Sequence, residues 1–433
     1  MQTRSIRLQS LVVALSGIIL IVLVQASIAG TRQYDVVIRN GRLLDGTASP
    51  WRQADVGIVD DRIVSVGYIP PDAIAEIAID ATGRYVAPGF IDAHSHAAEG
   101  LEVASRASAE ALLRQGITSV FINPDGGGPS DLTEQLKTIS RNIPGVNVAP
   151  MIGHNAVRRA VMGFDNRSPT PSELKQMEAL VRSAMEGQAF GLSSGPFYAP
   201  GKFADTSELV AMAKAAAEFP GAFHSSHVRD ESNYDVGVIA ALHELIEVSR
   251  QTGIIGIATH LKMLGPFVWD QSESLVEIIN AAREEGLSIW ADQYPYAASS
   301  TSLQAALVPG WAQEGGTKAI SSRLQDPKTL SVMRPQMVEN MARRAGPEAI
   351  LIASHVGDDS LVGRYLDDIA RRGGQDPLDT AIDILIEGDT NIVSFNMNEK
   401  DIEQIMRQPW TMTSSDGGVH KFGAGNPHPR SYG

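Results

Sequence analysis

Short apolar runs alternate with longer amphipathic stretches from residue 86 to the end of the chain. Continuous apolar runs are typical of buried parallel strands, and apolar residues at helical spacing are typical of the helices that connect such strands. This order predicts an α/β fold, a (β/α)8 barrel of the TIM type. The expected strands are residues 86–91, 118–122, 146–152, 190–193, 222–227, 254–260, 287–292 and 411–416. The expected helices include residues 108–115, 172–186, 207–219, 236–251 and 272–285.

Residues 34–83 show a different pattern. Short strands are separated by polar turns, among them Asn40-Gly41 and Asp60-Asp61. Alternation of this kind predicts a small β-domain, built as an antiparallel sandwich or sheet layer. Residues 84–433 then form the barrel domain.

Two segments depart from the barrel pattern. Residues 1–29 combine Arg4 and Arg7 with an apolar stretch and small residues at 27–29, which is the pattern of a signal peptide; an uncleaved anchor is the alternative. We therefore expect export, to the periplasm or out of the cell, and no membrane attachment after cleavage. Residues 301–346 interrupt the alternation after the seventh strand, and they form either a lid or a passive surface excursion.

Composition limits the binding partners and the metal ligands that the chain can have. The chain has a net charge of −14 at pH 7 and no cysteine. A chain this acidic is a poor partner for nucleic acid. Since no thiolate is available, a bound metal must be held by histidine and carboxylate side chains. The sequence leaves the oligomeric state open.

Metal-binding residue types follow the expected strands. His94 and His96 come directly after the first strand, and side chains two apart in an extended chain point to the same face. In a barrel, the carboxyl ends of the strands carry the active site. Four of the ten histidines and two carboxylates fall there: His94, His96, His227, His260, Asp125 and Asp416. This placement predicts a metal centre.

The run PGFIDAHSH at residues 88–96, behind a small β-domain, resembles the amidohydrolase superfamily. Within it, the chain is similar to the D-aminoacylase (N-acyl-D-amino-acid deacylase) family from about Tyr34 to its last residue. The matching stretches are GHN at 153–155, GLSSG at 191–195, HVRDE at 227–231, HLKM at 260–263, ADQYPY at 291–296, SDG at 415–417 and HPRSYG at 428–433.

The resemblance implies one or two zinc ions per chain and a role for each matching residue. His94 and His96 match the first metal pair, and His227 and His260 the ligands of the second zinc. Asp416 matches the carboxylate that takes a proton from the attacking water and returns it to the leaving amine. The positions that match the substrate pocket are Lys262, Tyr294, Ser300 and Arg430. A cation there suits the free carboxylate of an N-acyl amino acid.

Asp125 departs from the family pattern, because it stands where relatives have a metal-bridging cysteine. A carboxylate keeps the negative charge, and its two oxygens can span two metals, although it is a harder ligand than a thiolate. The alternative is a turn residue before Gly126-Gly127-Gly128. A carbamylated lysine bridge is disfavoured, since residues 191–195 contain no lysine.

The expected function is zinc-dependent hydrolysis of N-acyl-D-amino acids, a small-molecule substrate class whose D configuration rests on the resemblance alone. The alternatives are another amidohydrolase, such as a dipeptidase or cyclic-amide hydrolase, and an inactive metal-binding remnant. The remnant is considered because relatives continue beyond the point that matches Gly433. The fold is accordingly expected to be incomplete at the C-terminus and of low stability.

Overall fold

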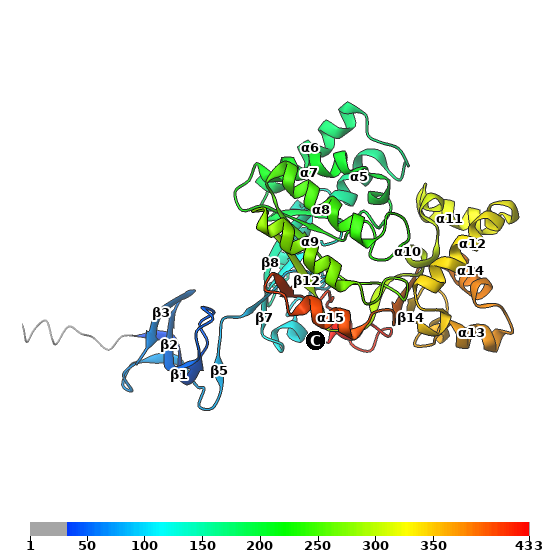
Figure 1. The fold of residues 1–433 in the computed structure, drawn as a ribbon. Helices are drawn as coiled ribbons and strands as arrows, with labels where there is room; N and C mark the ends of the chain where they lie inside the picture. Colours follow the sequence, from blue (N-terminus) through cyan, green and yellow to red (C-terminus); the bar gives the residue numbers. More distant parts are fainter. Residues whose placement is uncertain (1–32, 433) are drawn as a thin grey trace, which may run out of the picture. The chain divides into compact units, whose positions relative to one another are not determined.

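The computed structural model describes residues 33–432, and these form two compact units, residues 33–89 and residues 90–432 (Figure 1). The predicted signal peptide at residues 1–29 lies outside the described residues. Within the described part of the chain, no helix is both long enough and apolar enough to cross a membrane.

The first unit is a single five-stranded sheet with the order β3-β2-β1-β4, in which β5 also pairs with β1. Its strands are β1 (Tyr34–Leu43), β2 (Arg52–Val59), β3 (Arg62–Gly67), β4 (Ala75–Asp80) and β5 (Tyr85–Val86). The expected antiparallel layer is correct only for β1, β2 and β3, because β4 and β5 run parallel to β1. Small apolar clusters cover both faces of this sheet, around Val37 on one face and Val56 on the other.

Two local predictions for this region are wrong. Asn40-Gly41 is not a turn: β1 continues to Leu43, and Asn40, with a φ of 60°, lies in a bulge of the ladder. The single buried strand expected at residues 86–91 is divided between β5 and β6 (Phe90–Asp92), and Phe90 and Ile91 are exposed. Pro88 has no N–H to donate to a strand ladder, which explains the break. The turn at Asp60-Asp61 is confirmed.

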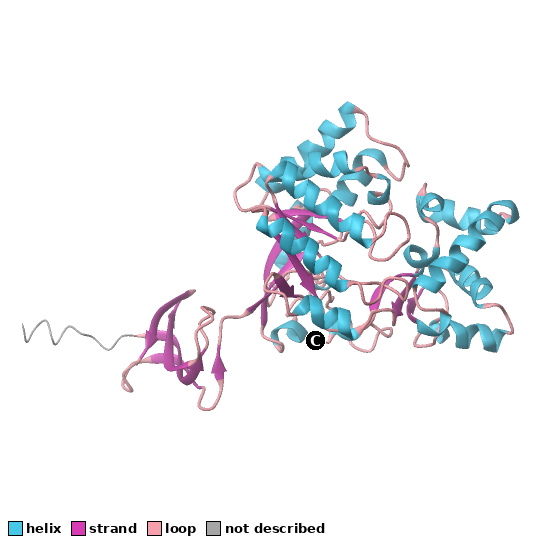
Figure 2. Ribbon diagram, in the orientation of Figure 1, coloured by secondary structure: helices cyan, strands magenta, loops and turns pink. Residues whose placement is uncertain are grey.

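The second unit contains the predicted barrel (Figure 2). Eight parallel strands follow the order β16-β12-β11-β10-β9-β8-β7-β6. After β6, the strands are β7 (Ile117–Ile122), β8 (Asn147–Gly153), β9 (Gly191–Ser194), β10 (Phe223–Ser226), β11 (Ile255–Ala258), β12 (Ile289–Gln293) and β16 (Thr411–Thr413). Each lies within or beside the range that the apolar pattern predicted.

Backbone hydrogen bonds beyond the strand ends join the first barrel strand to the last. The amide of Asp416 donates to the carbonyl of His94 at 2.9 Å, and the amide of His96 donates to the carbonyl of Gly417 at 2.8 Å. The backbone that carries the predicted site residues therefore closes the ring of strands.

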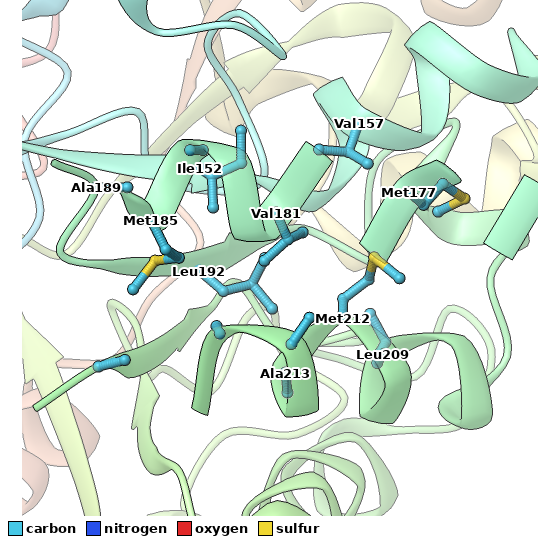
Figure 3. Packing of buried hydrophobic residues seen from close by; sticks show 14 of the residues in the cluster. Ile152, Val157, Met177, Val181, Met185, Ala189, Leu192, Leu209, Met212 and Ala213 are labelled. Carbon is cyan, nitrogen blue, oxygen red and sulfur yellow. The ribbon is translucent and has the colours of Figure 1, made fainter. Parts of the chain in front are cut away.

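Helices pack against the outside of the strands, as Figure 3 shows for α5, α6 and α7. Ile152 and Leu192, from β8 and β9, are fully buried against Val181 and Met212 of two of these helices. Thr170 and Glu173 form a capping box that fixes the start of α6. The helices around the barrel are α2 (Ala98–Leu101), α3 (Glu110–Leu113), α4 (Thr133–Arg141), α5 (His154–Met162), α6 (Pro171–Glu186), α7 (Thr206–Ala217), α8 (Val238–Thr252), α9 (Ser272–Glu284) and α15 (Glu399–Met406). The helix expected at 108–115 is reduced to α3.

The insertion between β12 and β16 is larger than the 301–346 segment seen in the sequence. It has its own antiparallel sheet, β13-β15-β14, and its own apolar core, which includes Leu307, Met337 and Ile392. In Figure 1 its helices form a yellow and orange lobe beside the barrel. Its elements are β13 (Ser299–Ser302), α10 (Leu303–Leu307), α11 (Gly316–Gln325), α12 (Pro327–Arg343), β14 (Ile350–His355), α13 (Leu366–Gly373), α14 (Pro377–Glu387) and β15 (Thr390–Ser394).

Candidate active site

The side chains predicted from the strand ends converge at one end of the barrel. They follow β6, β7, β10, β11 and β16. They form three overlapping groups, and within each group the possible ligand atoms lie within 4.8 Å of one another. The groups are His94, His96 and Asp125; His94, His260 and Asp416; and Asp125, His227 and His260. Residues more than 300 positions apart in the sequence thus meet because parallel strands end at the same rim.

Asp125 lies at the centre of this cluster, and its two oxygens face different histidines. Oδ2 is 3.4 Å from Nε2 of His96 and 3.5 Å from Nε2 of His94. Oδ1 is 3.4 Å from Nε2 of His260 and 3.8 Å from Nδ1 of His227. This is the arrangement expected of a carboxylate that spans two metal positions. Asp125 is a turn residue as well, since the amide of Gly127 donates to the carbonyl of Pro124 at 2.8 Å.

Asp416 lies beside the first histidine pair. Its Oδ1 is 3.1 Å from Nε2 of His96 and 3.5 Å from Nε2 of His94, and its Oδ2 accepts a hydrogen bond from Arg430. Burial raises the pKa of Asp416, but the charge of Arg430 and the two nearby imidazoles outweigh it and hold the pKa well below the ordinary value. The side chain is therefore an ionised acceptor.

The donor set fits zinc. Nε2 of His94 and Oδ1 of Asp125 are buried and have no hydrogen-bond partner among the described residues. Such atoms are costly to bury unless something binds them. Imidazole nitrogens with carboxylate oxygens are ligands that Zn²⁺ accepts, and the divided geometry at Asp125 provides for one or two ions.

Three of these residues have left-handed backbone conformations. The φ angles are 57° for Asp125, 35° for His260 and 50° for Asp416. Non-glycine residues seldom adopt such angles, and those that do concentrate at functional sites. Each angle turns the chain sharply after a strand, so that the side chain is directed into the site.

Glu231 is a site residue that sequence reasoning did not single out. Its Oε1 is 3.0 Å from Nδ1 of His260, and its Oε2 is 3.6 Å from Nε2 of His227. Burial raises the pKa of Glu231, but the charges of His227 and Lys262 outweigh it and lower the pKa. The available signal was its spacing, since Glu231 lies four residues after His227 within the HVRDE stretch.

The four residues predicted to bind substrate all line one cavity of about 640 Å³, together with Asp125 and Asp416. Nζ of Lys262 is 2.5 Å from Glu231 Oε1 and 2.7 Å from His260 Nδ1, so this amine already has a carboxylate partner. Tyr294 lies between two cations, with its ring 5.6 Å from Lys262 Nζ and 5.9 Å from Arg430 Cζ. Ser300, from β13, brings the insertion to the cavity wall.

Tyr198 is a second residue that sequence reasoning did not assign. Its ring centroid is 4.7 Å from that of His227, and its hydroxyl accepts a hydrogen bond from Thr301 at 3.3 Å. Tyr198 follows β9, whereas Thr301 belongs to the insertion. The cavity is therefore closed by side chains from both parts of this unit.

The other histidines lie apart from the metal candidates, with two exceptions that line the cavity, His420 and His428. His154 is buried against Glu208 at 2.7 Å, and His224 is 2.7 Å from Ser194 Oγ. The Nδ1 of His355 is 2.8 Å from Thr390 Oγ1, and His243 is exposed. These contacts give the buried members structural roles.

Comparison with known proteins places this geometry among metal-dependent hydrolases. Residues 78–422 match the model of the amidohydrolase family. The chain is 31% identical to an N-acyl-D-glutamate deacylase of Alcaligenes xylosoxydans xylosoxydans over 421 residues, which are 92% of this chain and 76% of the relative.

Two solved structures are similar over most of the chain. A crystal structure of N-acyl-D-glutamate deacylase from Bordetella bronchiseptica, with zinc and a phosphonate inhibitor, has a TM-score of 0.76 and 30% identity over 93% of this chain and 79% of its own. A D-aminoacylase with a binuclear metal centre has a TM-score of 0.75 and 26% identity, and the match covers 92% of this chain and 79% of that one.

Proposed function

The chain belongs to the amidohydrolase family, and on that premise we propose that it is a zinc-dependent deacylase of N-acyl-D-amino acids. The observation that carries the proposal is Asp125, whose two oxygens face two sets of histidines beside Asp416 in a single cavity. The relatives matched over most of the chain, N-acyl-D-glutamate deacylase and D-aminoacylase, support the substrate class.

The ligands we propose are His94, His96, Asp125, His227 and His260. Zinc held by these side chains would supply a water of lowered pKa and would polarise the amide carbonyl of the substrate. Asp416 is the general base in this proposal. The ionised carboxylate accepts a proton from the attacking water, and it then returns that proton to the nitrogen of the departing amino acid.

Arg430 has two roles in this proposal. One nitrogen, Nη1, donates to Asp416, which holds the carboxylate in place, while its other donors are available to the substrate α-carboxylate. Tyr294, Ser300 and Lys262 line the same cavity. A free α-carboxylate bound there leaves the adjacent amide bond next to Asp416, which orients the substrate for hydrolysis.

The deciding experiment is hydrolysis of N-acetyl-D- and N-acetyl-L-amino acids by the zinc-loaded protein, with dipeptides and hydantoins in the same series. We expect turnover of D forms, with L forms at least 100-fold slower. Turnover of dipeptides or hydantoins in preference to N-acetyl-D-amino acids would contradict the assignment. Zinc retention without turnover of any compound would identify a metal-binding protein that is not an enzyme.

We also propose that the protein is exported, on the sequence pattern of residues 1–29. Expression of the full chain in a Gram-negative host tests this. Recovery from the periplasm with a new N-terminus near residue 30 supports export, and recovery of the uncleaved chain in the cytoplasm contradicts it.

A further inference from the structure

Three long cationic side chains line the active-site cavity, and they differ in their partners. Lys262 is paired with Glu231, and Arg430 is paired with Asp416. The third is Arg344, which follows directly after α12 in the insertion. No carboxylate oxygen of residues 33–432 lies within 4.0 Å of its guanidinium. Arg344 is therefore the cavity cation without an anionic partner in the described part of the chain.

Arg344 is buried and hydrogen-bonded to neutral groups although it lacks a counter-charge. Its side chain belongs to a residue that is only 1% exposed. Nε donates to the hydroxyl of Tyr234 at 2.8 Å, and Nη1 donates to Oγ of Ser299 at 3.3 Å. Both acceptors are neutral, and Nη2 has no hydrogen-bond partner among the described residues. A buried guanidinium is costly unless an anion completes its environment.

Aromatic contacts relate Arg344 to the proposed metal ligand His227. Cζ of Arg344 is 5.7 Å from the ring centroid of Tyr234, and this ring packs edge-to-face against Phe197, with centroids 5.5 Å apart. Phe197 in turn packs on His227, with ring centroids 5.2 Å apart. Arg344 thus lies on the side of the cavity that holds His227, whereas Arg430 pairs with the proposed general base.

We propose that Arg344 binds a second carboxylate of the substrate, and that the protein prefers N-acyl amino acids that carry two carboxylates. This rests on the proposed deacylase function. The α-carboxylate is one carbon from the scissile nitrogen and stays near Asp416, so a carboxylate that reaches Arg344 belongs to a longer arm. That arm is either the amino-acid side chain or the acyl group. Arginine suits the role because its planar fork can bind a carboxylate with two parallel hydrogen bonds.

The experiment compares three substrates with the zinc-loaded protein: the dicarboxylates N-acetyl-D-glutamate and N-succinyl-D-glutamine, and N-acetyl-D-glutamine, which has only the α-carboxylate. We expect kcat/KM for one of the two dicarboxylates to exceed that for the monocarboxylate at least tenfold. The compound that does so identifies the arm. In Arg344→Met this ratio should fall at least tenfold, while kcat/KM for N-acetyl-D-glutamine changes less than threefold.

Arg343→Met is the matched control. Arg343 is the neighbouring residue, and its guanidinium lies over the same Tyr234 ring, but it does not line the cavity. It should leave the ratio unchanged. Arg344→Lys keeps the charge without the planar fork, so we expect an intermediate ratio, and this variant serves if the methionine variant does not fold.

The proposal is overturned if the wild-type protein does not discriminate between the dicarboxylates and the monocarboxylate. It is also overturned if Arg344→Met lowers kcat/KM for all three substrates equally, since a loss common to all substrates marks a structural residue. Absence of turnover for every compound contradicts the deacylase function instead. In that case calorimetric binding of the same compounds decides: tighter binding of a dicarboxylate that is lost in Arg344→Met supports the anion site, and equal binding rejects it.

Discussion

Glu231 and His260 form a pair behind the metal centre: Oε1 of the carboxylate is 3.0 Å from Nδ1 of the imidazole. The other ring nitrogen of His260, Nε2, faces Oδ1 of Asp125 at 3.4 Å. A carboxylate in this position accepts a hydrogen bond from Nδ1–H, which leaves the lone pair of Nε2 free for a metal. Lys262 neutralises the charge that Glu231 brings into the site.

Glu231→Gln should weaken zinc binding about 10- to 100-fold, because it removes the acceptor that fixes the tautomer and orientation of His260. Zinc affinity is measured by competition with a chelator. Glu277→Gln, an exposed change on α9, is the control and should have no effect. Equal zinc affinity in the two variants would contradict this role for Glu231.

Asp125→Asn should lower the zinc content, because it removes the negative charge that faces both sets of histidines. Metal analysis of the dialysed protein tests this. Asp131→Asn lies in the same connection after β7 but is exposed, and it should keep the wild-type zinc content. If Asp125→Asn keeps the full content as well, Asp125 is only a turn residue.

Asp416→Asn should lower kcat about 100- to 10,000-fold, since the amide cannot accept the proton. Zinc bound by Asp125, His227 and His260 should remain, because that group of ligands does not include Asp416. Steady-state kinetics and zinc analysis on the same preparation test both parts. A loss of kcat below tenfold would exclude Asp416 as the general base.

His224 should make the protein less stable in mild acid. Burial lowers its pKa from 6.5 to about 3, so the unfolded chain binds this proton first. The free energy of unfolding therefore falls as the pH drops below 6.5, by about 1.4 kcal/mol per pH unit at most, until the pH approaches the folded pKa.

Urea unfolding of the wild type and of His224→Gln, at about pH 7.5 and about pH 5.5, isolates this contribution. The loss of stability between the two pH values should be smaller in the variant by about 1 kcal/mol. An identical loss in both proteins would show that His224 does not titrate in this way.

The buried group of His154, Arg158 and Glu208 should be essential to stability. Glu208 accepts hydrogen bonds from both partners, and each of the three side chains is 1% exposed or less. Glu208→Gln leaves Arg158 buried without a counter-charge, which should cost about 3–5 kcal/mol of unfolding free energy. Glu218→Gln, which breaks the exposed pair with Arg182, should cost less than about 1 kcal/mol. Equal costs in urea unfolding would contradict the difference.

Most of the barrel could be predicted from the sequence because its strands are continuous apolar runs, and this pattern depends only on burial. The exceptions are places where pairing depends on distant segments. The residues of β4, Ala75–Asp80, do not determine whether this strand runs parallel or antiparallel to β1. The bulge at Asn40 has the same sequence signature as a turn. The apolar runs of the insertion resemble those of the barrel. The sequence pattern therefore does not show that the insertion continues as far as β15.

For the site, the strand-end rule and the family resemblance selected side chains that meet in space. What the sequence could not provide is the partner of each charge. Lys262 and Arg430 both read as free cations, whereas the structure pairs each with a carboxylate. Arg344 lies 44 residues beyond Ser300, in a helical stretch that matches none of the family motifs. Its place in the cavity wall depends on how the insertion folds, which the sequence pattern does not show.

The backbone hydrogen bond from the Asp416 amide to the His94 carbonyl has a consequence for folding. It joins the first barrel strand to the last, and these strands are far apart in the sequence. Pairings of such high sequence separation form slowly, because the long intervening loop must be closed first. We therefore expect the proposed general base to reach the histidine pair only when the barrel closes, so that activity and the closed barrel should appear together during refolding.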